Sequence, residues 1–70
     1  MSSNLTRVTV NLTPRAIRAL DGLVVADGCG KTDVVNRAVV GYGYLHSKVR
    51  EGAELKLHYP TGAVEAVTFL

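Results

Sequence analysis

The 70-residue sequence lacks the features that usually stabilise so small a protein. Cys29 is the only cysteine, so no disulfide can form within the chain. His46 and His58 stand apart from each other and from Cys29, which gives no metal-ligand spacing, and no cofactor or metal is expected. A domain of this size buries only about 60% of its unfolded surface. Because 47% of the residues are apolar, the sequence predicts that association between chains completes the core.

Long apolar runs are missing as well. No stretch approaches the roughly 18 apolar residues of a membrane span, and residues 1–10 contain no apolar run of signal-peptide length. A lone thiol suits a reducing compartment, so we expect a cytoplasmic protein with no membrane partner. No nucleophile–base–acid set and no glycine-rich phosphate loop is visible, so an enzyme is not expected.

Charge is distributed unevenly along the chain. Residues 1–50 carry seven basic and three acidic side chains, a net charge of +4, whereas residues 51–70 carry one basic and three acidic side chains, a net charge of −2. A basic portion that is doubled in a dimer favours a polyanionic partner. The same charges on a solvated surface would need no partner, so the charge alone does not choose between the two interpretations.

Residues 6–12 show the first clear pattern, a strict alternation of two sets of side chains. One set is apolar or β-branched: Thr6, Val8, Val10 and Leu12. The other set is polar: Arg7, Thr9 and Asn11. Alternation with period two predicts a strand with one buried face. Thr13-Pro14 then provides a capping side chain and a residue suited to the first helical position.

Two helices are predicted next. The first runs from about Pro14 to Asp27 and ends at Gly28 in a left-handed conformation. Its apolar stripe comprises Ala16, Ile17, Leu20, Leu23 and Val24. The second begins between Gly30 and Thr32 and ends between Arg50 and Gly52; its stripe comprises Val34, Val35, Ala38, Tyr42, Leu45 and Val49. Two glycines inside the second helix either permit close packing or mark a break, namely Gly41 and Gly43.

The tail of the chain predicts a β-hairpin within residues 53–70. Pro60-Thr61-Gly62 suits a three-residue loop, a type I turn followed by a left-handed glycine. If Tyr59 faces Ala63, Glu65 is the one charged residue on an otherwise apolar side. The apolar members of that side are Leu55, Leu57, Tyr59, Ala63, Val67 and Phe69.

The strand predicted over residues 6–12 has no neighbour within the first fifty residues, and an unpaired strand is unstable. Two solutions stay open. The strand pairs with the same strand of a second chain to form an antiparallel ribbon, or it pairs with the C-terminal hairpin to form a three-stranded sheet within one chain.

The residues from Arg7 to Val40, RVTVNLTPRAIRALDGLVVADGCGKTDVVNRAVV, resemble the ribbon-helix-helix (MetJ/Arc-type) DNA-binding proteins over about half of the chain. The shared features are the alternating strand, its capping Thr13, the stripe of the first helix and a G-x-(Ser/Gly)-x-(Ser/Thr) turn into the second helix. The chain has Gly30 in that turn where the family often has serine.

The resemblance implies a mainly α protein with short β, an intertwined homodimer in which residues 1–52 form the DNA-binding and dimerisation core and residues 53–70 a hairpin extension. It implies a cytoplasmic, DNA-associated transcriptional repressor of a bacterium, an archaeon or a phage. The partner is double-stranded DNA, read in the major groove by the outward residues Arg7, Thr9 and Asn11. The start of the second helix then contacts phosphates through Gly30, Lys31 and Thr32.

A protein-interaction module is the alternative function. In that hypothesis an antitoxin-like or phage-like adaptor uses the dimer core as a platform and the hairpin to bind a protein partner. The polar outer face of residues 6–12 discriminates between the two hypotheses, because an apolar outer face would favour a protein partner. Arg7, Thr9 and Asn11 therefore favour DNA.

Overall fold

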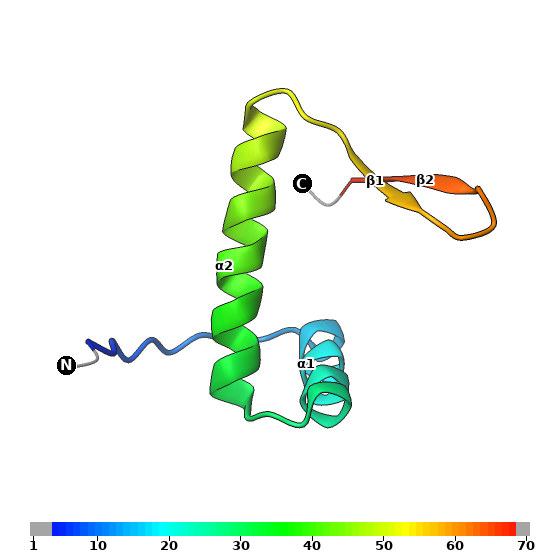
Figure 1. Cartoon of the computed structure of the whole chain (residues 1–70). Coiled ribbons are helices and arrows are strands. Elements are labelled where there is room, and N and C mark those ends of the chain that lie inside the picture. Colours follow the sequence, from blue (N-terminus) through cyan, green and yellow to red (C-terminus); the bar gives the residue numbers. More distant parts are fainter. Residues whose placement is uncertain (1–3, 69–70) are drawn as a thin grey trace. The chain divides into compact units, whose positions relative to one another are not determined.

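The computed structural model of the chain describes residues 4–68. Helices α1 (Pro14–Asp27) and α2 (Lys31–Arg50) are followed by strands β1 (Leu55–His58) and β2 (Val64–Val67), as Figure 1 shows. The fold is mainly helical with one short antiparallel sheet, as the sequence predicts. The chain divides into two units, residues 1–34 and 35–70. Most of α2 belongs with the hairpin, and the predicted division at residue 52 stays a prediction.

Helix α1 has the bounds predicted for it, because both of its ends are set by local hydrogen bonds. The Oγ1 of Thr13 accepts a hydrogen bond from the N–H of Ala16 at 3.1 Å, and Pro14 follows directly. At the other end Gly28 has φ +65° and ψ +29°, and its N–H donates to the carbonyl of Val24 at 3.0 Å. Thr13 and Gly28 therefore satisfy backbone groups that a bare helix end leaves unpaired.

Helix α2 runs without interruption through both of its internal glycines. The carbonyl of Gly30 accepts from the N–H of Val34 at 3.2 Å, so the helical hydrogen bonds begin at the capping Gly30. A Cβ added at Gly41 or Gly43 would meet no atom within 4 Å in one chain. The alternative of a break is therefore wrong, whereas close packing of these glycines against another chain stays a prediction.

The core of a single chain is small. Among residues 4–68, Leu20 and Val34 are the only buried apolar residues, and both lie in the first unit. Three residues of α1 spaced four apart are at least partly shielded from solvent, namely Ala16, Leu20 and Val24. The rest of its predicted stripe, Ile17 and Leu23, is exposed. One chain thus covers only part of the apolar surface that the sequence pattern assigns to the interior.

The C-terminal hairpin has the predicted register and turn. Leu55 pairs with Val67 and Leu57 with Glu65, antiparallel. At the tip, the N–H of Tyr59 donates to the carbonyl of Ala63 and the N–H of Gly62 to the carbonyl of Tyr59, both at 2.9 Å. Gly62 has φ +94°, which favours glycine because it has no Cβ. Phe69, which the sequence assigns to the apolar side, lies outside the described residues.

The segment before α1 differs from the prediction. No helix or strand is formed between residues 4 and 13, and the sheet in the described part of the chain contains only β1 and β2. The strand predicted over residues 6–12 is therefore wrong for one chain alone, as is the three-stranded sheet. The physical reason is that a strand needs a neighbouring backbone, which one chain does not supply here. Pairing between two chains stays a prediction.

Candidate nucleic-acid interface

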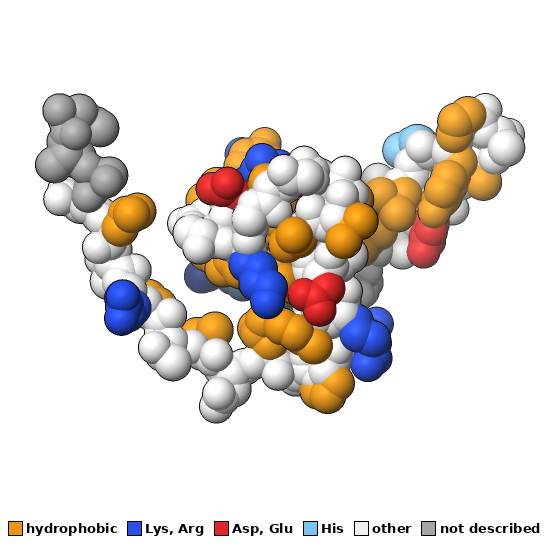
Figure 2. Space-filling model, turned by 90° about the horizontal axis from the view of Figure 1, so that it is seen from below, with side chains coloured by type: hydrophobic (Ala, Val, Ile, Leu, Met, Phe, Trp, Pro, Cys, Tyr) orange, Lys and Arg blue, Asp and Glu red, His pale blue; other side chains and the backbone are white. Residues whose placement is uncertain are grey.

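The segment ahead of α1 presents both of its alternating sets to solvent. Its apolar members Val8, Val10 and Leu12 are 72%, 64% and 44% exposed. Figure 2 shows hydrophobic side chains along this segment and on the hairpin. Leaving three large apolar side chains in water on one short segment is unfavourable by about 1.5–3 kcal/mol for each, relative to full burial. One chain therefore leaves three large apolar side chains of this segment in contact with water.

The residues predicted to contact bases, Arg7, Thr9 and Asn11, lie on the same segment and are all exposed. Arginine offers a planar donor fork, asparagine a donor and an acceptor side by side, and threonine a hydroxyl next to a methyl group. These are the groups that read base edges in the major groove. One chain carries these three side chains on a segment without regular secondary structure, so their mutual geometry depends on the pairing of the segment.

The residues predicted to contact phosphate adjoin the turn that starts α2. Gly28 and Gly30 border this turn, and Gly30, Lys31 and Thr32 are exposed. A Cβ at Gly30 would meet nothing within 4 Å, so the backbone here is open to close approach. A helix start carries a partial positive charge from its N–H groups, and Lys31 adds a full one. These three consecutive residues lie together at the helix start, and their contact with phosphate stays a prediction.

One residue at this helix start was missed by the sequence analysis. Asp33 lies in the first turn of α2. A carboxylate there stabilises the helix through the helix dipole and repels a phosphate approaching the same end. Its position one residue after the capping turn was visible in the sequence. Lys31 offsets this charge, so a phosphate contact at the site depends on that lysine.

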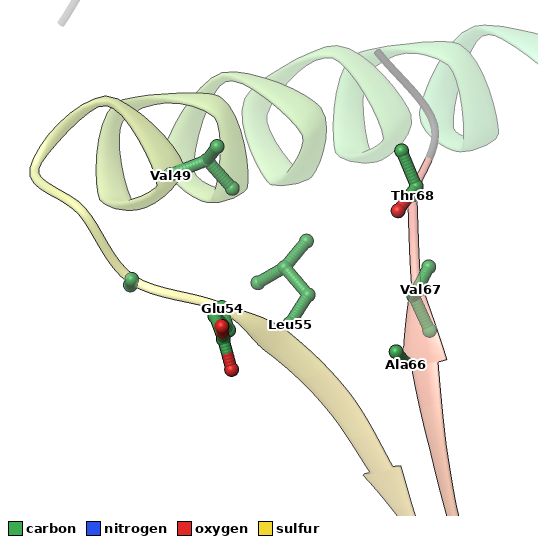
Figure 3. A pocket seen from close by; sticks show the side chains of 7 residues that line it. Val49, Glu54, Leu55, Ala66, Val67 and Thr68 are labelled. Carbon is green, nitrogen blue, oxygen red and sulfur yellow. The ribbon is translucent and has the colours of Figure 1, made fainter.

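The second unit contains an apolar groove between the C-terminal end of α2 and the hairpin (Figure 3). Its volume is about 300 Å³. Apolar residues that line it include Val49, Ala53, Leu55, Ala66 and Val67. The carboxylate of Glu54 lies at its edge, 3.5 Å from the Nζ of Lys56, and so is already paired. The lining offers hydrophobic contact rather than catalytic groups.

Glu65, the charged exception on the apolar side of the hairpin, has a specific partner. The hydroxyl of Tyr59 donates a hydrogen bond to its Oε1 at 2.6 Å. This bond, with a smaller contribution from desolvation, raises the pKa of Tyr59 above its usual value of 10.0. The sequence analysis placed both residues on one side of the hairpin but did not identify the bond between them.

The described part of the chain offers no group of three or more His, Cys, Asp or Glu residues arranged to bind a metal ion. Neither helix within residues 4–68 combines the length and the hydropathy needed to cross a membrane. Comparison of the chain with protein-family models, curated proteins and solved structures finds no match. A proposal for the function therefore depends on the residues of the chain itself.

Proposed function

We propose that this protein is a sequence-specific DNA-binding protein that acts as a homodimer and represses transcription. The observation that carries the proposal is the alternation in residues 6–12. Val8, Val10 and Leu12 require a cover, whereas Arg7 and the other members of the polar set need none and match base edges.

The small core of one chain supports a second copy as that cover. Among residues 4–68, Leu20 and Val34 are the only buried apolar residues, whereas Val8, Val10 and Leu12 are exposed. A second copy related by two-fold symmetry presents the same three apolar side chains, so the two sets can cover each other.

The strand pairing that joins the copies also orients the polar set. When residues 6–12 pair with the same segment of a second chain, Val8, Val10 and Leu12 share one face and the polar set shares the other. Alternate residues of a strand are about 6.6 Å apart, close to two steps of 3.4 Å along a DNA strand. A two-stranded β-ribbon fits the major groove of DNA.

The start of α2 supports the proposal as a phosphate contact. Gly30, Lys31 and Thr32 provide an open backbone, a positive charge and a hydroxyl at one helix start. Contacts of this kind hold a protein in register on DNA without reading sequence. The polar strand face and this helix start therefore divide recognition into a base-reading part and a positioning part.

The test starts from a DNA site selected from random sequence. Arg7→Ala and Asn11→Ala are each expected to cost about 1–3 kcal/mol in binding and to relax preference at particular base pairs. Lys31→Ala should weaken binding to all sequences alike and make the dependence of affinity on salt shallower. Lys56→Ala, which removes a positive charge from the hairpin, is the control and should change neither property.

Two results would contradict the proposal. If Arg7→Ala and Asn11→Ala leave specific binding intact in a folded dimer, the ribbon does not read bases. If the unaltered protein shows no affinity for DNA even at low salt, the protein-interaction module becomes the better hypothesis. The exposed Leu57 and Tyr59 on the hairpin are then its first candidate contacts.

A further inference from the structure

Each strand of the hairpin has an open edge, along which alternate residues direct their backbone N–H and C=O groups away from the other strand. The N–H of Tyr59 donates to the carbonyl of Ala63, so these two residues form a hydrogen-bonded pair. In an antiparallel ladder such pairs alternate with pairs that do not exchange hydrogen bonds. With the observed register, the backbone N–H and C=O groups of Lys56 and His58 therefore point away from β2, toward the open edge of β1. On β2, the N–H and C=O groups of Val64 and Ala66 point toward the other open edge.

Only one of these edges is protected against pairing with another strand. The β1 edge carries Lys56, whose side chain is half exposed, and Pro60 follows shortly after the strand. Lysine and proline are the usual means of protecting an edge. The β2 edge has neither, and Val64 on it is 53% exposed. Because a two-stranded sheet alone is only marginally stable in water, a further strand on this open edge would stabilise it.

We infer that β2 pairs antiparallel with β2 of a second copy, forming a four-stranded sheet across two chains. The first reason to choose a second copy is that two-fold pairing covers the open β2 edge of both chains at once. The second reason is that one register places no like charges opposite each other. With the two-fold axis at Ala66, Ala66 faces its own copy and Glu65 faces Val67 of the second copy.

Two registers centred nearer the turn are less favourable. An axis at Glu65 would place two like charges directly opposite each other, which is destabilising. An axis at Val64 would pair β2 with the turn residues Thr61 and Gly62 rather than with strand residues. The register centred on Ala66 avoids both problems. This inference concerns association alone and does not depend on DNA binding.

Disulfide trapping tests the register directly in the full chain. In a Cys29→Ser background, Ala66→Cys is compared with His58→Cys, which places the thiol on the β1 edge instead. Facing residues of a hydrogen-bonded antiparallel pair have Cα atoms about 5.5 Å apart, within the range of a disulfide. Mild oxidation should convert most of the Ala66→Cys protein to a covalent dimer and little of the His58→Cys protein. Equal yields, or no covalent dimer from either, would overturn the inference.

Amide hydrogen exchange tests the same inference in the unaltered protein, without any substitution. The amides of Val64 and Ala66 should exchange at least ten times more slowly than those of Lys56 and His58. Similar exchange at both edges would overturn the inference. Slow exchange at Val64 and Ala66 without the covalent dimer would overturn it too, by placing another strand at this edge. Both measurements are made without DNA, so they can fail while the DNA-binding proposal stands, and the converse also holds.

Discussion

The two alternating regions of this chain, residues 6–12 and residues 55–67, have similar patterns and different structures. Both place apolar side chains at alternate positions, with Glu65 the exception in the C-terminal region. The C-terminal region forms two paired strands, whereas the N-terminal region forms none in one chain. The difference lies in the partner. Pro60-Thr61-Gly62 brings β2 back onto β1, whereas residues 6–12 lead into α1 and have no partner nearby in the sequence.

The comparison shows that alternation determines which residues share a face but not whether a strand forms. Closing a hairpin loop of a few residues carries a small entropic cost. Joining two chains costs about 4–15 kcal/mol in lost translational and rotational freedom. The N-terminal ribbon can therefore form only if a large surface is buried with it, which makes its stability dependent on protein concentration.

The substitution with the largest expected effect breaks the N-terminal region. Val10→Asp should prevent folding of the dimer, because an unpaired charge inside the proposed interface costs about 3–5 kcal/mol or more. Thr9→Asp, one residue away on the opposite face, is the control and should leave a folded dimer. Circular dichroism and sedimentation equilibrium measure both outcomes. A stable, folded monomer of the Val10→Asp protein would show that this segment does not join the chains.

A substitution in the turn breaks the C-terminal region. Gly62→Ala forces a Cβ into a backbone with φ +94° and should destabilise the hairpin by about 1–3 kcal/mol. Gly22→Ala inside α1, where an added Cβ meets nothing within 4 Å, is the matched control, since a helical alanine is favoured over glycine by about 0.5–1 kcal/mol. Urea unfolding followed by NMR signals of β1 and β2 measures both. An unchanged hairpin in the Gly62→Ala protein would mean that the turn does not determine the pairing.

Two threonines allow a smaller comparison between the regions. Thr13 Oγ1 accepts from the N–H of Ala16 at 3.1 Å, whereas Thr61 Oγ1 accepts from the N–H of Ala63 at 3.4 Å. Thr13→Ala should cost about 1 kcal/mol as the loss of a helix cap. Thr61→Ala should cost less, because its bond is longer than the usual range. Equilibrium denaturation decides the order, and a larger loss for Thr61→Ala would contradict it.

The smallest expected effect concerns Tyr59 and pH. Its raised pKa means that the folded chain holds the phenol proton more tightly than the unfolded chain does. The stabilisation is therefore fully present below pH 10 and is lost as pH rises through the raised pKa. The free energy of unfolding should fall more steeply above pH 10 for the unaltered protein than for Tyr59→Phe. Parallel pH profiles would mean that the bond to Glu65 does not persist in solution.

Much of the site was predictable from local signals. The first helix and its caps follow from Thr13, Pro14 and Gly28, whose side chains or backbone act within a few residues of their own position. The exposed start of α2 with Lys31 follows in the same way, although Asp33 was overlooked. The alternation separates the polar and apolar sets of residues 6–12, but the strand that would orient them was not predictable for one chain.

The sequence by itself determined the helices, the turn at Gly62 and the register of the hairpin, because capping and turn formation involve residues close together in the chain. Only the tertiary structure decided that α2 passes unbroken through Gly41 and Gly43 and that Tyr59 bonds to Glu65. It also decided that one chain leaves the apolar set of residues 6–12 in water. Burial and strand pairing depend on contacts with residues that are distant in the sequence or belong to another chain. A periodic pattern within one segment does not identify those contacts.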